Sequence, residues 1–297
     1  MRMLFLATLF LATLTLFAPR PCAACDRPKL EPAIVAAQAE LVALAEVAEV
    51  TAEDRITARV TNVLKGSKPP APIEIRGLVT VRKSRFEPCQ SIVVEAGKSY
   101  IFYLLEGSRG GARVVDPLDS VDLPDNLERA RKAVEQNGQA SVRKQVGALE
   151  SVLVSKKRTW AKDEDVDLQV IVENGGASAI PWKLRTWPPS EHSYCELEIK
   201  GLGGKHVPPT DVPIARKDIE DYFSKHGPSG DYDVPPGRAQ RLTLDRINSA
   251  KPGWGYKETL GFRYYPLPPG TYQIAARCSR YFPKTVETNP ITIEVTP

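Results

Sequence analysis

Five cysteines are the residues of this 297-residue sequence best suited to covalent chemistry. They stand at positions 22, 25, 89, 195 and 278. Cys22 lies at the end of an apolar N-terminal stretch, and its removal would leave an even set of four, which favours two disulfides in an oxidising compartment. Because disulfide-bonded cysteines have no thiolate, no catalytic cysteine is expected.

Other residues that often carry catalysis lack the required spacing. His192, His206 and His226 are 14 and 20 residues apart, so no two imidazoles share a helix face as metal ligands do. The segment Gly227 to Gly230 lacks the Gly-x-Ser-x-Gly pattern of a hydrolase nucleophile. Gly201 to Gly204 lacks the lysine that follows in a phosphate loop, and predicts a tight hairpin. We therefore expect no catalytic residue, no metal site and no cofactor.

Acidic and aromatic groups are also predicted to be structural. The residues Asp163 to Asp165 and Glu220 to Asp221 lack the glycine and closing glutamate of a calcium loop, so we expect solvated turns. Six aromatic residues gather in the C-terminal half, where core packing is the favoured interpretation and a binding face is the alternative. They are Trp182, Trp187, Trp254, Tyr256, Tyr264 and Tyr265.

The N-terminal stretch predicts export. Arg2 precedes an apolar run from Leu4 to Ala18, and small residues end at Ala24, which together are typical of a signal peptide over residues 1–24. The run is shorter than the roughly 20 residues of a membrane-spanning helix, so no spanning segment is expected after cleavage. We expect a periplasmic or extracellular protein that begins at Cys25, with a lipid attached to Cys25 as the alternative.

The charge of the chain argues against nucleic acid as a partner. The formal net charge is +4, and it falls to about +2 without Arg2 and Arg20. Phosphate recognition needs a far more concentrated basic surface. The length after cleavage suits two domains on the usual prior.

Hydrophobic periodicity predicts a β-rich first domain over residues 25–138. Residues 28–40 favour a short helix, with one helix continuing to Val50 as the alternative, and apolar residues alternate from Arg55 to Leu64 as in a strand. Many short strands indicate a small barrel or sandwich. Further strands are expected at Ile73 to Ile75, Ser91 to Glu95, Ser99 to Leu105 and Arg113 to Val115, and a helix at Asp125 to Asn137, with a domain boundary near residues 138–147.

The second domain, residues 147–297, is predicted to be an immunoglobulin-like β-sandwich with a helical insertion near residues 207–233. Cys195 and Cys278 both fall on predicted strands, so a bridge within this domain is the natural pairing. Closing a loop of ~80 residues would contribute about 4 kcal/mol on the loop-entropy model. The strands are expected at Leu149 to Val154, Val166 to Val172, Trp182 to Thr186, Cys195 to Lys200, Ala239 to Leu244, Gly270 to Cys278 and Ile291 to Val295, and the inserted helix at Arg216 to Lys225.

The first domain contains five spaced fragments, Cys25, Ala39 to Val47, Val63 to Gly66, Pro88-Cys89 and Gly97 to Tyr103. In this order they resemble a known family, the netrin-like domain shared with tissue inhibitors of metalloproteinases. The resemblance implies an OB-type barrel and a disulfide from Cys25 to Cys89. The C-terminal region resembles immunoglobulin-like domains of exported bacterial proteins, through Pro269 to Ile274 and Asn289 to Val295.

The resemblance implies a function for the mature N-terminus. In these inhibitors the α-amine and carbonyl of the first cysteine chelate the catalytic zinc of the target protease. Carried over, this role falls to Cys25, with Asp26 directed toward the protease's specificity pocket. The chemistry is available because an α-amine has a pKa near 7.7 to 8.0 and binds metal once deprotonated.

The sequence thus predicts an exported, non-enzymatic module that binds another protein. The sharper hypothesis is an inhibitor of a zinc metalloprotease. The alternative is a cell-envelope scaffold or adhesion protein that acts through its immunoglobulin-like domain, and an enzyme with dispersed acidic residues is a third interpretation.

Overall fold

The structure is a computed structural model that describes part of the chain. The described residues are 30–52, 55–78, 92–106, 111–116, 119–182, 195–213, 232–234, 236, 239–242, 244, 246–247, 261–279 and 284–297. The predicted signal peptide (residues 1–24) and the site residues Cys25, Asp26 and Cys89 lie outside them.

The first half of the chain forms a closed barrel of five strands. These strands are β1 (Leu41–Ala52), β2 (Arg55–Lys65), β3 (Ile73–Arg76), β4 (Ser99–Glu106) and β5 (Ala112–Val114). Their order is β1-β2-β3-β5-β4, and pairing of β1 with β4 closes the ring. The β3–β5 pair is parallel and the other pairs are antiparallel, an arrangement compatible with an OB-like fold.

Alternation along the strands fills the barrel. On β2, Ile56, Ala58 and Val60 point inward, and between them lie exposed or half-buried residues. Tyr100 and Phe102 of β4 also lie inside, with their rings edge to face and their centroids 6.2 Å apart. One additional short strand, β6 (Val121–Asp122), pairs with β4.

Two sequence predictions are decided in this half. The helix α2 (Pro32–Gln38) ends before β1 begins at Leu41, so the alternative of one helix to Val50 is wrong. The strand predicted at Ser91 to Glu95 is also wrong over its described residues, 92–95. There the Tyr100 hydroxyl accepts a hydrogen bond from the Glu95 N–H at 3.1 Å and donates one to the Val93 carbonyl at 3.3 Å. A side chain thus makes the hydrogen bonds that a neighbouring strand would otherwise make.

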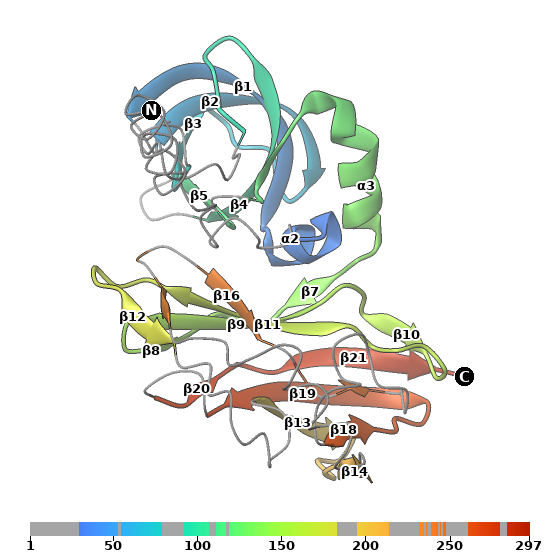
Figure 1. The fold of residues 1–297 in the computed structure, drawn as a ribbon. Helices are drawn as coiled ribbons and strands as arrows, with labels where there is room; N and C mark the ends of the chain where they lie inside the picture. The colour runs from blue at the N-terminus through green and yellow to red at the C-terminus, as the bar shows by residue number, and fades with distance from the viewer. Residues whose placement is uncertain are drawn as a thin grey trace, which may run out of the picture.

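The second half of the chain contains two sheets packed face to face (Figure 1). The inner sheet, nearer the barrel, is β16 (Ala239–Leu242), β11 (Leu168–Asn174), β9 (Leu149–Ser155) and β7 (Gln139–Ala140), with β8 (Lys144–Val146) also on β9. The outer sheet is β10 (Thr159–Ala161), β21 (Ile291–Thr296), β19 (Gly270–Cys278) and β13 (Cys195–Gly201), with β20 (Val286–Glu287) on β19. We call this pair of sheets the two-sheet unit.

Five shorter strands form two further small sheets in this half. One pairs β12 (Ile180–Trp182) with β15 (Tyr232–Val234). The other joins β14 (Thr210–Pro213), β18 (Gly261–Tyr265) and β17 (Arg246–Ile247). Of the predicted insertion near 207–233, residues 210–213 are thus a strand, and the predicted helix from Arg216 to Lys225 lies outside the described residues.

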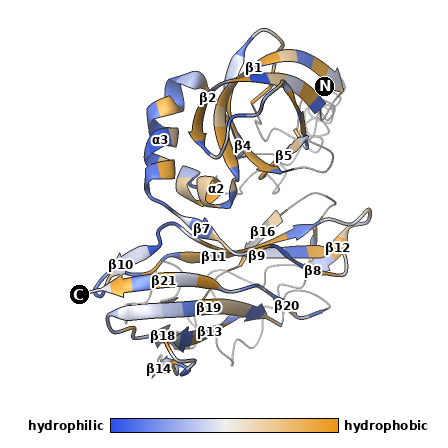
Figure 2. Ribbon diagram, turned by 180° about the vertical axis from the view of Figure 1, so that it is seen from behind, coloured by the Kyte–Doolittle hydropathy of each residue, from blue (hydrophilic) through white to orange (hydrophobic). Residues whose placement is uncertain are grey.

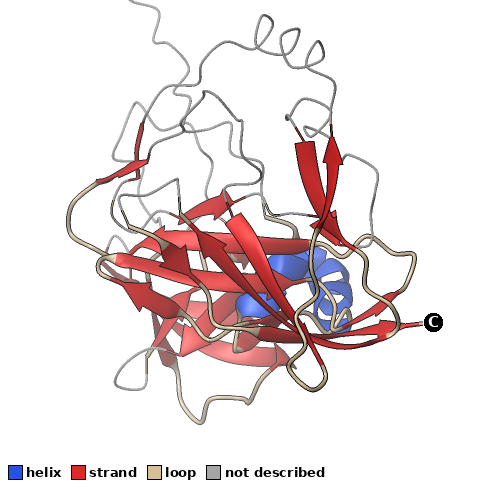
Figure 3. Cartoon of the chain, turned by 90° about the horizontal axis from the view of Figure 1, so that it is seen from below, coloured by secondary structure: helices blue, strands red, loops and turns tan. Residues whose placement is uncertain are grey.

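The barrel and the two-sheet unit share one apolar core at their junction. Helix α2 lies between them, beside α3 (Leu127–Glu135), which follows a single 3₁₀ turn (Pro124–Asn126) (Figures 1 and 3). Ile34 of α2 is fully buried and belongs to the same cluster as Val152 and Val154 on β9. In Figure 2, α2 is pale to orange while α3 carries hydrophilic residues on its outer side. The inner sheet is therefore covered on both faces, by the outer sheet and by α2.

Close approach at this junction explains one glycine. A Cβ added at Gly138 would lie 2.8 Å from the Ala37 Cβ and 2.8 Å from the Lys156 carbonyl oxygen. Any side chain there would push α2 away from the end of β9. The residue that links α3 to β7 must therefore be glycine if the two units are to meet.

Candidate functional site

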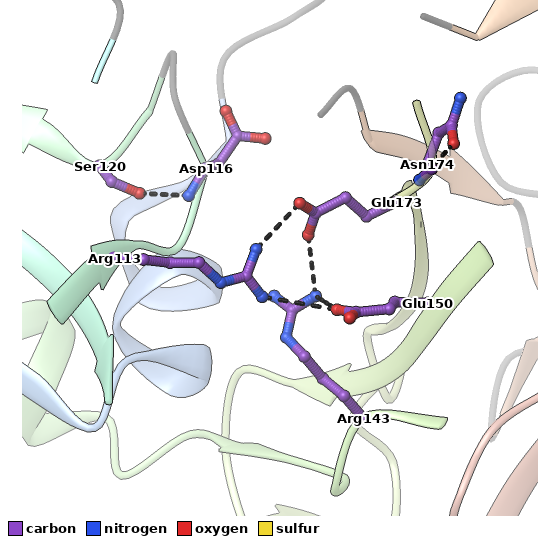
Figure 4. Close-up of polar contacts among 8 residues, drawn as sticks. Arg113, Asp116, Ser120, Arg143, Glu150, Glu173 and Asn174 are labelled. Atoms are coloured by element: carbon purple, nitrogen blue, oxygen red, sulfur yellow. Dashed lines mark hydrogen bonds and ion pairs between the residues drawn. The ribbon is translucent and has the colours of Figure 1, made fainter. Parts of the chain in front are cut away.

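Four charged side chains meet where the barrel touches the inner sheet (Figure 4). Glu150 on β9 and Glu173 on β11 are directly opposite in the antiparallel register. Two carboxylates so placed repel each other and destabilise a sheet. Arg113 reaches them from β5 of the barrel, and Arg143 from the chain just before β8.

The two guanidinium groups compensate this repulsion. Arg113 Nη1 donates to Glu173 Oε1 at 3.0 Å, and Arg143 Nη1 donates to Glu173 Oε2 at 3.0 Å. Glu150 Oε2 lies 3.4 Å from Arg113 Nη2 and 3.6 Å from Arg143 Nη1. Each carboxylate thus contacts both cations, and the four formal charges cancel. We call these four residues the junction cluster.

The electrostatics of the junction cluster suit a joint better than proton transfer. Burial lowers the pKa of the Arg143 guanidinium, and the neighbouring Glu173 opposes this effect. Glu173 is itself only 12% exposed at its side chain. Glu173 uses both of its carboxylate oxygens in hydrogen bonds to the two guanidinium groups, which is the geometry of a salt-bridge network. The arrangement fixes the barrel on the two-sheet unit.

The start of the described chain is fastened to the same junction. The Leu30 N–H donates to Asp119 Oδ2 at 3.1 Å. Lys156, at the end of β9, contacts Glu31 Oε2 at 2.8 Å and also pairs with Asp167. Burial opposes the charge on Lys156, but hydrogen bonds to Asp167 and Glu31 raise its pKa above the usual value. The chain that leads out of the N-terminal segment is therefore held by both halves of the protein.

Several residues selected from the sequence have structural roles. Cys195 and Cys278 form the predicted disulfide, across directly opposed positions of β13 and β19 with Cα atoms 4.0 Å apart. Tyr265 is buried, and its hydroxyl donates to the Leu197 carbonyl at 2.9 Å. Of the other predicted aromatic residues, Trp187, Trp254 and Tyr256 lie outside the described residues, as do the side chains of Trp182 and Tyr264.

The remaining motifs also form ordinary surface structure where they are described. Gly201 to Gly204 makes the expected hairpin, in which the Val207 N–H returns to the Ile199 carbonyl at 2.9 Å. Glu164 lies in a turn and pairs with Lys157. His206 is exposed, 3.9 Å from Glu198, while His192, His226, Glu220 to Asp221 and Gly227 to Gly230 lie outside the described residues.

A second polar site lies on the solvent face of the outer sheet. A hollow of about 350 Å³ opens over β13 and β19. Lys144 contacts Glu287 at 2.9 Å and Lys200 contacts Glu198 at 2.6 Å, and these hydrogen bonds lower the pKa of both carboxyl groups. Because its charges are paired with one another, this surface offers few uncompensated groups to a ligand.

Among the described residues, no group of three or more histidine, cysteine, aspartate or glutamate residues is placed to hold a metal ion. Within the same part of the chain, no helix has the length and apolar character needed to cross a membrane. Known protein families, curated proteins and solved structures contain no match to this chain. Its function must be argued from its own residues.

Proposed function

We propose that this chain is an exported, non-enzymatic protein-binding module, and that its mature N-terminus at Cys25 inhibits a zinc metalloprotease. In this proposal the barrel is netrin-like, the two-sheet unit is immunoglobulin-like, and Cys25 is bonded to Cys89. The α-amine and carbonyl of Cys25 would chelate the zinc of the protease, while Asp26 enters its specificity pocket.

The attachment of Leu30 is the observation that carries the proposal. An inhibitor that works through its terminus must hold that terminus close to a rigid body, because ordering a loose segment costs binding free energy. Leu30 is bonded to Asp119, and α2 follows at once in the buried junction. Only four residues stand between Cys25 and Leu30 in the sequence, so five Cα-to-Cα steps limit the distance of the terminus from this point to about 18 Å.

The disulfide within the two-sheet unit supports the exported part of the proposal. Cys195 and Cys278 are fully buried and bonded. Stable disulfides are typical of the periplasm and the extracellular space, and rare in reducing compartments.

Mass spectrometry of the exported protein tests the terminus. The expected result is an unmodified α-amine on Cys25 and a bond from Cys25 to Cys89. A lipid or acetyl group on that amine would remove the zinc ligand and refute the inhibitor hypothesis.

A panel of purified zinc proteases tests the mechanism. Three forms are compared: the exported protein, a form with one alanine added before Cys25, and a control with one alanine added after Pro297. Chelation predicts that the added N-terminal alanine abolishes inhibition and that the control retains it. Equal inhibition by all three would exclude chelation, and no inhibition with an intact Cys25 amine would favour an envelope scaffold or adhesion protein.

A further inference from the structure

An open groove of about 410 Å³ lies between α2 and α3, on the outside of the junction. One wall is the start of α2, formed by Glu31, Pro32 and Ala33. The other wall is a single face of α3, since residues 129, 132, 133 and 136 have the i, i+3, i+4, i+7 spacing of one helix face. Figure 1 shows the two helices side by side, beyond the edge of the barrel.

Two alanines form part of the lining of the groove. Ala33 and Ala133 are each only 5% exposed and belong to the junction core. Both residues also line the groove. Because their side chains are already almost buried, the groove offers a ligand little apolar surface, and its charge must select the occupant.

The charge of the groove distinguishes it from the other polar surfaces. Arg129 and Lys132 are both exposed, and neither forms an ion pair with any residue of the described chain. On the same helix, Arg131 is paired with Glu128 at 2.7 Å. The single acid of the groove, Glu31, is held by Lys156 at 2.8 Å. Among the described residues, neither positive charge of the groove therefore has an ion-pair partner, unlike the charges of the junction cluster and of the hollow on the outer sheet.

We propose that this groove binds an acidic segment of a partner polypeptide. Carboxylates of the segment contact the exposed side chains of Arg129 and Lys132. Charge complementarity selects this occupant, because the groove carries no acid without a cation of its own. Binding here does not depend on zinc chelation by Cys25, so the two proposals can fail separately.

The probe is a fluorescein-labelled peptide of alternating glutamate and leucine, whose binding to the full exported protein is followed by fluorescence anisotropy. The test variant is Arg129→Gln with Lys132→Gln. Exposed ion pairs are individually weak, at about 0.2 to 1 kcal/mol each, so losing two should weaken binding by about 2- to 30-fold. Glutamine keeps a good helix propensity at both positions, so α3 should persist, as circular dichroism will check.

A matched control removes the same charge elsewhere. Lys162→Gln with Lys205→Gln changes two exposed residues outside the groove and should change affinity by less than about twofold. Gln136→Glu adds a negative charge at the end of the groove and should weaken binding of the acidic peptide, without altering a buried position.

Three results would overturn the proposal. The first is no binding of the acidic peptide to the unmodified protein at about 1 mM. The second is equal weakening by the groove variant and its control, which would mean a general effect of net charge. The third is equal affinity for a peptide in which every glutamate is replaced by lysine.

Discussion

Replacing Glu173 tests whether the junction cluster stabilises the protein. Glu173→Gln removes one negative charge and leaves Arg113 and Arg143 facing Glu150 alone, at 3.4 and 3.6 Å. Removing one partner of a fully buried ion pair costs about 3 to 5 kcal/mol. Side chains here are partly open to water, with Arg113 at 38% and Glu150 at 30% exposure, so screening reduces the expected loss to about 2 kcal/mol.

Urea unfolding, followed by tryptophan fluorescence, measures this loss. The matched control is Glu128→Gln, which breaks the exposed pair with Arg131 on α3. Such a pair contributes at most about 0.5 kcal/mol, so the control should leave the unfolding midpoint nearly unchanged. If Glu173→Gln is no more destabilising than Glu128→Gln, the cluster does not hold the junction.

A double-mutant cycle between Arg113 and Glu173 isolates the contact across the junction. The barrel contributes Arg113 and the two-sheet unit contributes Glu173, so their coupling free energy reports on the joint itself. Neighbouring residues in one ion-pair network couple by about 0.5 to 3 kcal/mol. A coupling near zero would mean that the Arg113–Glu173 ion pair does not hold the two units together.

Three further predictions concern single structural features. Gly138→Ala should destabilise the protein by about 1 to 3 kcal/mol in urea unfolding, because the new Cβ would lie 2.8 Å from the Cβ of Ala37. The control is Gly175→Ala, whose Cβ would have its nearest neighbour at 3.6 Å and which should cost less than about 1 kcal/mol. Tyr103→Phe should stabilise by about 1 kcal/mol, since the buried Tyr103 hydroxyl has no hydrogen-bond partner among the described residues. Burial first, then the nearby Asp122, raises the pKa of Tyr103 to about 12. The stability present below pH 10 should therefore fall as the pH rises from 10 toward 12, and should fall less in the variant. Reducing the Cys195–Cys278 disulfide should lower the free energy of unfolding by about 4 kcal/mol, and an unfolding midpoint that is unchanged by dithiothreitol would refute this.

Local patterns predicted much of the fold. The alternating apolar residues from Arg55 to Leu64 predicted a strand, which is β2 of the barrel. The short helix predicted within residues 28–40 is α2, which begins at Pro32. The pairing of Cys195 with Cys278 followed from their places on predicted strands. These features depend on periods of a few residues and on turn chemistry, which a single sequence displays directly.

Features that depend on register escaped prediction. Glu150 and Glu173 are 23 positions apart in sequence, and they become a repelling pair only in the register of β9 with β11. Arg113, which compensates them, comes from another unit. The Val93 carbonyl accepts its hydrogen bond from the Tyr100 hydroxyl instead of from a neighbouring strand, and residue type alone does not reveal this choice of donor.

Two apolar runs in the sequence indicate the doubly covered sheet. Val152-Leu153-Val154 and Val170-Ile171-Val172 are unbroken apolar runs on neighbouring strands, whereas a sheet with one solvated face alternates. Leu153, Val170 and Val172 face the core of the two-sheet unit, and the other three residues face the junction. Such runs indicate a sheet covered on both sides, and they could have predicted that the second half is packed against something else.

The doubly covered inner sheet also limits how this protein can be divided. Cutting the chain near residues 138–147 would leave Val152, Val154 and Ile171 on an uncovered face, and would strip β9 of its partners β7 and β8. Exposed apolar sheet faces promote aggregation. We therefore expect that neither half can be exchanged for another domain. We also expect that the two halves have been duplicated or lost together during evolution.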